Sequence, residues 1–177
     1  MASLAARSLT ALETPIKLCG RVVHGFGRGS AKLGFPTANL GINWEGTAED
    51  IADADERAVR TFVDENRTGI YAAWAQVADG SDRGVYKVAM SVGWNPHFGD
   101  LERKTIEAWL LHDFDADFYD KRLKVVVVGF VRPELKFGSL EELIREISAD
   151  GDFCRDALDA HVGCGPSDAA YFAPAEA

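Results

Sequence analysis

Hydrophobic residues gather first in six short stretches of the chain and later at helical spacing. The six stretches are rich in β-branched and aromatic residues, and several end at turn-forming residues, as strands do. They are Ile16–Gly25, Pro36–Asn39, Gly69–Val77, Val85–Val92, Lys104–Phe114 and Leu123–Val131. The last stretch contains consecutive valines from Val125 to Val128, which indicates a strand buried on both faces.

A first helical segment interrupts the predicted strands between Thr47 and Asn66. Thr47 and Asp50 have the spacing of a capping pair. The apolar residues that follow recur at helical spacing: Ile51, Ala54, Ala58, Val59, Phe62 and Val63. We interpret this segment as an inserted surface helix without a catalytic role, because connections tolerate insertions.

Helical spacing returns after Phe137 and continues to residue 161. Ser139 and Glu142 form a capping box for a helix whose buried stripe is expected to be Leu140, Leu143, Ile144 and Ile147. A shorter helix is expected over Phe153–His161. Strands first and helices last predict an antiparallel β domain covered by helices. We expect one domain over residues 16–161, with flexible tails over residues 1–15 and 162–177.

Composition narrows the possible functions. The 177 residues carry a formal net charge of −9, which argues against a nucleic-acid binder with a broad basic face. No apolar run reaches transmembrane length, so we expect no membrane association. Cys19, Cys154 and Cys164 lack zinc-ligand spacing, and a reducing compartment, the cytoplasm, fits them best. The first ten residues lack acids, which leaves mitochondrial targeting open as an alternative.

The glycine-rich stretch His24–Asn39 carries the first candidate chemistry. Its early glycines, beginning with Gly25, allow positive φ and let backbone amides form an anion-binding concavity. Pro36 suits the first residue of a strand, in which Thr37 and Asn39 share one face. A hydroxyl and an amide carbonyl are oxygen ligands that Mg²⁺ accepts beside substrate phosphates. A glycine-rich hairpin followed by an edge strand is the alternative.

Four further motifs occur in a characteristic order. They are Ser91–Phe98, Lys104–His112, Asp117–Tyr119 and Arg132–Phe137. Together with the glycine-rich stretch, this pattern resembles riboflavin kinase over most of the chain. The resemblance implies a closed six-stranded antiparallel Greek-key barrel with C-terminal helices packed against it. It also implies transfer of the ATP γ-phosphate to the ribityl 5′-hydroxyl of riboflavin, which yields FMN and ADP, with Mg²⁺ or alternatively Zn²⁺ or Mn²⁺.

The resemblance also assigns site residues. Glu107 matches the general base, and Thr37 and Asn39 match the metal ligands. The positions matched to ATP are Gly25, Thr37 and Ala31, where the family often has a lysine that Lys32 could replace. The positions matched to flavin are Leu110, His112, Tyr119, Arg132, Leu135 and Phe137. Strict alternation places Leu110 and His112 opposite Glu107, so either a bulge intervenes or they contribute backbone groups.

Three rival functions remain to be weighed. A non-catalytic flavin-binding barrel would not need Glu107, Thr37 and Asn39 together. An oligonucleotide-binding barrel would need a basic groove, which the acidic composition does not favour. An enzyme that also adenylylates FMN would need a second domain, for which the length leaves no room. We therefore expect a riboflavin kinase, acting as a monomer on riboflavin and ATP without nucleic acid or membrane partners.

Overall fold

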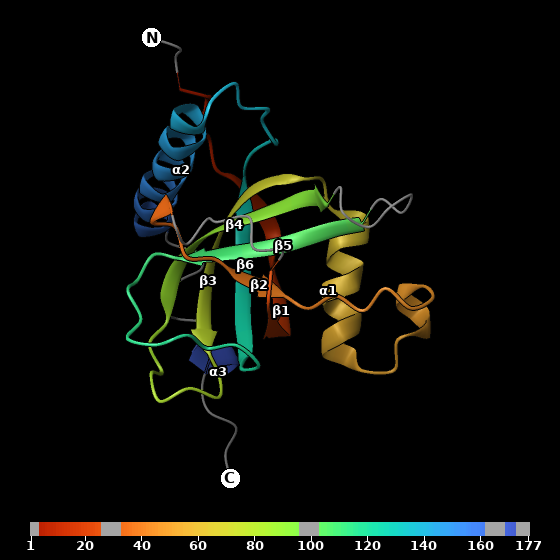
Figure 1. Cartoon of the computed structure of the whole chain (residues 1–177). Coiled ribbons are helices and arrows are strands. Elements are labelled where there is room, and N and C mark those ends of the chain that lie inside the picture. The colour runs from red at the N-terminus through yellow and green to blue at the C-terminus, as the bar shows by residue number, and fades with distance from the viewer. Residues whose placement is uncertain (1–3, 26–32, 96–102, 162–168, 173–177) are drawn as a thin grey trace.

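The computed structural model describes residues 4–25, 33–95, 103–161 and 169–172. Its six strands are β1 (Thr10–Val23), β2 (Ala38–Leu40), β3 (Gly69–Val77), β4 (Tyr86–Asn95), β5 (Arg103–Leu110) and β6 (Arg122–Arg132). They close into a barrel in the order β1-β2-β5-β4-β3-β6, with every neighbouring pair antiparallel (Figure 1). Strands β3, β4 and β5 form a meander and β2 lies beside β5, which is a Greek-key order. The predicted barrel is confirmed.

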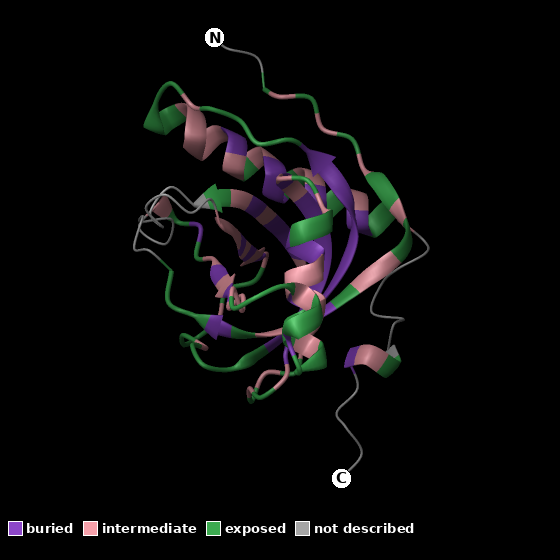
Figure 2. Ribbon diagram, turned by 90° about the vertical axis from the view of Figure 1, so that its right-hand side faces the viewer, coloured by how far each residue is buried: buried purple, intermediate pink, exposed green. Residues whose placement is uncertain are grey.

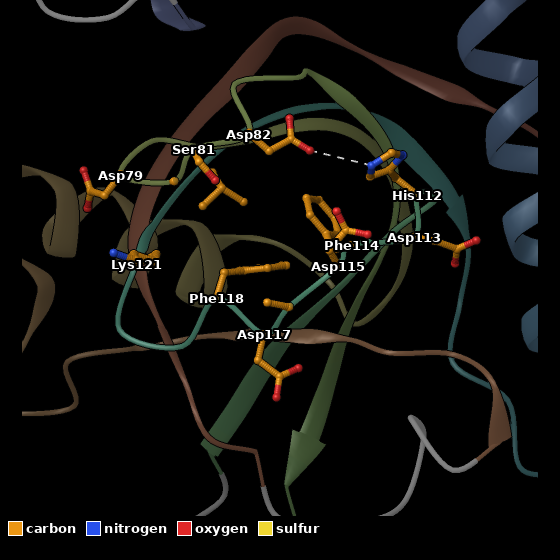
Figure 3. A pocket seen from close by; sticks show the side chains of 13 residues that line it. Asp79, Ser81, Asp82, His112, Asp113, Phe114, Asp115, Asp117, Phe118 and Lys121 are labelled. Atoms are coloured by element: carbon orange, nitrogen blue, oxygen red, sulfur yellow. Dashed lines mark ion pairs between the residues drawn. The ribbon is translucent and has the colours of Figure 1, made fainter.

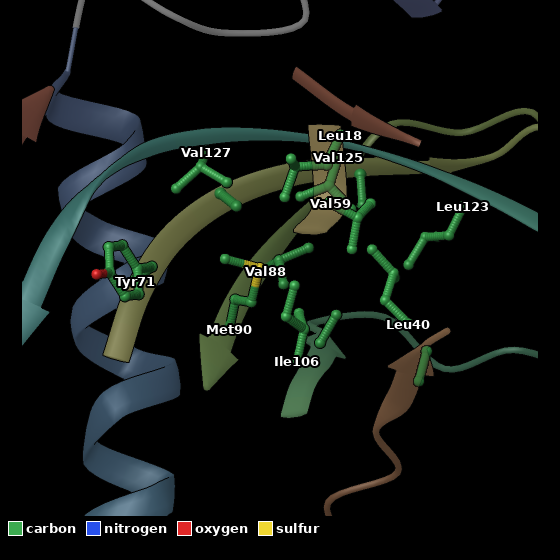
Figure 4. Close-up of a cluster of buried hydrophobic side chains, with 14 of the residues drawn as sticks. Leu18, Leu40, Val59, Tyr71, Val88, Met90, Ile106, Leu123, Val125 and Val127 are labelled. Atoms are coloured by element: carbon green, nitrogen blue, oxygen red, sulfur yellow. The ribbon is translucent and has the colours of Figure 1, made fainter. Parts of the chain in front are cut away.

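The barrel interior is filled by side chains that alternate along each strand. On β5, Ile106, Ala108 and Leu110 point inward and are almost fully buried. Figure 4 shows labelled residues of the other strands, such as Leu18, Met90 and Val125, directed into the same space. Because side chains of a strand alternate between faces, the residues between these inward positions lie on the outside of the barrel. This alternation places Glu107 on the outer surface.

The N-terminal part of the chain begins its strand earlier than the sequence predicted. Strand β1 starts at Thr10 instead of Ile16, and Thr10 pairs with Phe130 of β6. Upstream of the strand, Arg7 forms ion pairs with Glu146 and Asp150. Residues 10–15, predicted to belong to a tail, therefore extend the sheet, and Ala5 and Arg7 contact the C-terminal helix.

The inserted segment forms a 3₁₀ turn, η2 (Ala48–Asp50), and a helix, α1 (Ala54–Glu65). Thr47 and Asp50 form the predicted capping box, but it caps η2, whereas Asp53 caps α1 by accepting from two backbone amides. Helix α1 lies against β1 and β5, and Val59, Phe62 and Val63 join the barrel core. The insertion is thus a packed helix, as predicted, and it also completes the hydrophobic core.

A single helix, α2 (Leu140–Ala160), replaces the two C-terminal helices that the sequence predicted. It packs on β3 and β4, while α1 lies against β1 and β5 (Figure 1). The helix continues through Gly151, where a Cβ atom would lie 2.3 Å from Cζ3 of Trp109. Glycine costs about 1 kcal/mol in a helix relative to alanine. Glycine is nevertheless found here because the helix backbone lies so close to the Trp109 ring that a Cβ atom would clash with it.

A short helix, α3 (Ala169–Phe172), lies within the predicted C-terminal tail. The Tyr171 hydroxyl donates to the Leu18 carbonyl at 2.6 Å, and Phe172 is buried. Most of the buried residues, coloured purple in Figure 2, lie on the strands of the barrel. None of the helices in the described part of the chain is long and apolar enough to cross a membrane.

Candidate active site

The candidate site is a row of polar side chains on the outer face of three neighbouring strands. Asn39 of β2 and Ser91 of β4 lie directly opposite Glu107 of β5, one on each side. Directly opposed residues of antiparallel strands share a face, so the three side chains project together. Thr37, just before β2, donates from its hydroxyl to Glu107 Oε2 at 3.4 Å. The structure thereby brings together the three predicted residues Thr37, Asn39 and Glu107.

Gly25 lies at the edge of this row. A Cβ atom on Gly25 would lie 2.5 Å from Nδ2 of Asn39, so the chain passes close to the Asn39 amide only because residue 25 has no side chain. The structure therefore places Gly25 beside Asn39, and the assignment of Gly25 to ATP stays a prediction. Two other residues assigned to ATP, Ala31 and Lys32, lie outside the described residues.

Oxygen atoms dominate the donor groups of this row. They come from a hydroxyl at Thr37, an amide at Asn39 and a carboxylate at Glu107. In the described residues, no three His, Cys, Asp or Glu side chains gather as a metal site. Mg²⁺ is commonly held by one or two protein groups together with substrate phosphates and water, so it does not need three protein ligands. The donor set therefore fits a magnesium ion that arrives with a nucleotide.

A cavity of about 320 Å³ opens near the end of β5, where the chain leaves the barrel at residues 112–118 (Figure 3). His112 lines it, stacked on Tyr86 with 3.9 Å between ring centroids and paired with Asp82 at 3.7 Å. Asp82 also accepts from the Tyr86 hydroxyl and the Gly84 amide, and these hydrogen bonds hold the pKa of its carboxyl below the usual value. The aromatic rings of Phe114 and Phe118 line the same cavity.

Tyr119 follows this cavity in sequence and stacks on His24. Their ring centroids are 3.8 Å apart and the rings are 24° from parallel. Since His24 precedes Gly25, which lies against Asn39, the stacked pair borders the polar row on the glycine-rich side. His24 had been assigned no role from the sequence. Its stacking partner is distant in sequence, so no local pattern could have revealed the contact.

Leu110 does not reach the outer face. Its side chain is 3% exposed and belongs to the barrel core, and the pairing of β4 with β5 runs without a bulge from Val88–Leu110 to Asn95–Arg103. Of the two expected alternatives, the bulge is therefore absent, and the Leu110 side chain does not share the face of Glu107. Alternation decides the position, and only the backbone of Leu110 remains available.

Arg132 is also occupied elsewhere. Its Nε and Nη2 bind the Asp150 carboxylate at 2.8 and 2.5 Å, its Nη1 donates to the Pro133 carbonyl, and the residue is 4% exposed. The guanidinium of Arg132 is thus turned toward the carboxylate that α2 supplies, and its match to a flavin position stays a prediction.

The remaining predicted flavin residues fall into two groups. Tyr119 lies just before β6, whereas Leu135 and Phe137 lie just after it. Strand β6 has eleven residues and spans about 33 Å at a rise of about 3 Å per residue. One tricyclic ring cannot reach both ends of such a strand. His112 and Tyr119 therefore lie at one end of the barrel, and Leu135 and Phe137 follow the other end of β6, so we treat them as two separate candidate regions.

Glu134 links the second region to the polar row. A Cβ atom on Gly93 would lie 2.7 Å from Oε1 of Glu134, so this carboxylate covers the outer face of β4 two residues from Ser91. Sequence reasoning missed both Glu134 and Ser91. Ser91 could have been found from the strand period, but its register opposite Glu107 required the folded sheet.

Comparison with known proteins decides the family. Residues 12–158 match the family model described as "Flavokinase: Riboflavin kinase". The chain belongs to the riboflavin kinase family. The riboflavin kinase of Mus musculus is 40% identical over 140 residues, which cover 79% of this chain and 79% of that protein.

Two further members of the riboflavin kinase family extend the comparison. A bifunctional riboflavin kinase/FMN phosphatase of Arabidopsis thaliana is 46% identical over 145 residues, or 82% of this chain. This chain matches only 34% of the length of that relative. The crystal structure of riboflavin kinase from Trypanosoma brucei superposes with a TM-score of 0.56 at 29% identity, covering 82% of this chain and 81% of that one. The match to the riboflavin kinase model begins after Arg7 and ends before α3.

Proposed function

We propose that this protein transfers the γ-phosphate of ATP to the ribityl 5′-hydroxyl of riboflavin, giving FMN and ADP. Membership of the riboflavin kinase family supports the reaction. The observation that carries the mechanism is the row formed by Thr37, Asn39 and Glu107, with the Thr37 hydroxyl 3.4 Å from the Glu107 carboxylate. Phosphorylation of an alcohol needs a base, a phosphate cradle and a counter-charge, and this row offers a candidate for each.

Glu107 serves as the general base in this proposal. Its carboxylate projects from the outer face of β5, where a ribityl hydroxyl can approach, while both strand neighbours point into the core. A positioned carboxylate accepts the hydroxyl proton as the oxygen attacks phosphorus. The rigid barrel fixes its position, because β5 is hydrogen-bonded on both sides.

Thr37 and Asn39 hold a divalent cation, preferably Mg²⁺, together with the nucleotide phosphates. The cation would offset negative charge on the phosphoryl group during transfer. Thr37 also contacts the phosphates, and the glycine-rich stretch after His24 supplies backbone amides to them. Because the protein carries a net charge of −9, such local donors are needed to attract two anionic ligands.

The two binding regions lie on opposite sides of Glu107. We assign the nucleotide to the side of His24, Gly25 and Tyr119, because Gly25, which matches an ATP position of the family, lies there against Asn39. We assign the flavin ring to the side of Leu135 and Phe137, whose apolar surfaces can cover it. This division replaces the single flavin region implied by resemblance, and it moves His112 and Tyr119 to the nucleotide.

The proposed activity is tested by incubating the protein with riboflavin, ATP and Mg²⁺ and separating FMN from riboflavin. We expect FMN to form, and a Thr37→Ala/Asn39→Ala variant to lose nearly all turnover while still quenching riboflavin fluorescence. Thr61→Ala, on α1, is the control and should retain turnover. Riboflavin binding without FMN formation by the wild type would instead favour a non-catalytic flavin-binding module.

A further inference from the structure

A closed cluster of four charged side chains lies between the N-terminal segment, the end of β6 and α2. It consists of Arg7, Arg132, Glu146 and Asp150, whose side chains are 7%, 4%, 3% and 4% exposed. Two positive and two negative charges balance one another. Removing one member of such a buried set leaves an uncompensated charge, which the remaining members can relieve only by moving or by admitting water.

Asp150 is the shared member of the cluster. Arg132 binds it through two bonds, from Nε to Oδ1 at 2.8 Å and from Nη2 to Oδ2 at 2.5 Å. Arg7 Nε binds the same Oδ1 at 2.8 Å. The Asp150 carboxylate is therefore fixed from two sides, and Arg7 restrains the group on which the Arg132 guanidinium rests.

Arg132 passes this restraint to the segment that follows β6. Its Nη1 donates to the Pro133 carbonyl at 2.9 Å. Residues 133–137 contain no regular secondary structure, and they lead through Glu134, which covers Gly93, to Leu135 and Phe137. The guanidinium of Arg132 thus contacts both the Asp150 carboxylate and the first residue of this segment.

Arg7 is itself held in one position. Its Nη2 binds Glu146 Oε2 at 2.6 Å and the Glu146 carbonyl at 3.0 Å, and its Nη1 donates to the Ala5 carbonyl at 2.7 Å. The Ser8 amide donates to the Val131 carbonyl at 3.4 Å. The N-terminal segment therefore runs beside the end of β6 and α2, at the same end of the molecule as the segment before α2 (Figure 1).

We propose that Arg7 is a positioning residue for flavin binding, acting through Asp150 and Arg132 on residues 133–137. The inference rests on the proposed function, because it takes Leu135 and Phe137 as the side chains that cover the flavin ring. It also goes beyond the family match, which begins at residue 12 and so does not include Arg7. The flavin region is completed by a segment upstream of the matched domain.

The test compares steady-state kinetics of the wild type, Arg7→Ala and Arg155→Ala. Arg155 is the matched control, since it pairs with Asp152 at 2.9 Å on the exposed side of α2 and lies outside the cluster. Residues coupled through a packed network change binding by about 2- to 30-fold when mutated. We expect the KM for riboflavin of Arg7→Ala to rise within this range, with the KM for ATP unchanged and with Arg155→Ala equal to the wild type.

Direct binding gives a second readout. Riboflavin fluorescence titrations should show the same loss of affinity in Arg7→Ala, in protein whose circular dichroism matches the wild type. A folded Arg7→Ala variant with wild-type affinity and KM for riboflavin would overturn the inference. An equal rise in the KM values for riboflavin and ATP would also overturn it, because it would indicate a general loss of structure.

Arg7→Lys keeps the test decisive if Arg7→Ala does not fold. Lysine retains the charge but cannot form the planar fork that reaches Asp150 and Glu146 at once. We expect a smaller rise in the riboflavin KM than for alanine, again without a change for ATP, and an unchanged value would count against the inference. A wild type that forms no FMN and binds no riboflavin would refute the proposed function. An active wild type whose Arg7 variants have unchanged riboflavin binding would refute only the role of Arg7.

Discussion

The inner and outer faces of β5 differ in composition and in what they contact. Inward, Ile106, Ala108 and Leu110 are at most 3% exposed and belong to the barrel core. Outward, Glu107 remains partly exposed beside Thr37, whereas Trp109, two residues on, packs against Gly151 of α2. The inner face is thus uniform, while the outer face changes within one strand period from a candidate site to a helix-packing surface.

This difference shows how a small barrel combines stability with chemistry. The interior is close-packed, so each change of volume there affects folding. The outer face is constrained only where another element covers it. Substitutions on the two faces should therefore separate cleanly into effects on unfolding and effects on catalysis, and the following predictions test that separation.

The largest effect is expected for Glu107→Gln on the outer face. Glutamine keeps the size of the side chain but does not accept a proton at neutral pH, and general-base catalysis typically contributes about 10²–10⁴-fold. We expect turnover to fall by that factor, towards its lower end if the transition state is loose. Steady-state kinetics measure the fall, and thermal unfolding should show little change in stability.

The result would contradict the assignment if folded Glu107→Gln turned over at the wild-type rate. Weaker riboflavin binding with unchanged turnover would instead make Glu107 an anchor for the ribityl chain. Ser91→Ala, at the neighbouring position of the row, is an informative comparison, because it removes a polar group of the same face without removing the carboxylate.

Leu110→Ala tests the inner face. Truncation of a buried leucine costs about 2–5 kcal/mol through lost burial and a residual cavity. Denaturant unfolding should show this loss, while the riboflavin KM of the folded protein stays constant. Leu140→Ala is the control, because Leu140 is exposed, contrary to its prediction as part of a buried stripe, and the change should affect neither quantity. A raised riboflavin KM without a loss of stability would mean that the Leu110 side chain touches the flavin.

Gly151→Ala tests the covered part of the outer face. The new methyl group would lie 2.3 Å from the Trp109 ring, and overpacking costs about 1–3 kcal/mol, against a gain in helix propensity of about 1 kcal/mol. We expect a lower melting temperature with unchanged turnover. Ser148→Ala, exposed on the same helix, should not be destabilising. Stabilisation by Gly151→Ala would show that α2 does not need this close approach.

The smallest effect concerns Glu146 in the buried cluster. Burial raises the pKa of its carboxyl, but hydrogen bonds from Arg7 and the Ala5 amide outweigh burial and leave the pKa below its ordinary value of 4.5. A carboxyl whose pKa is lowered on folding stabilises the protein above its unfolded pKa and loses this contribution as pH falls through the folded pKa.

We therefore expect the stability advantage of the wild type over Glu146→Gln to be constant near neutral pH and to shrink below about pH 4.5. Urea unfolding between pH 7 and pH 3 measures it, with Glu141→Gln on the exposed side of α2 as the control for loss of one charge. An advantage that grows on acidification would refute the lowered pKa.

The sequence by itself determined most of the strands and the shared face of Thr37 and Asn39, and the resemblance to riboflavin kinase implied the barrel. Strand β3 was predicted at its observed bounds, and β4, β5 and β6 within a few residues, because alternation and β-branched composition are local properties. The same period placed Thr37 and Asn39 on one face. The family motifs then singled out Glu107, and register brought it opposite Asn39.

Only the tertiary structure decided which side chains have ion-pair or packing partners within the protein. Arg132 pairs with Asp150, eighteen residues away, and Arg7 joins them from the other end of the chain. Gly151, which reads locally as a helix break, lies inside α2 because it packs against Trp109. The two binding regions separate because β6 runs its full length between Tyr119 and Leu135. Each outcome depends on partners distant in sequence, and local periodicity carries no information about them.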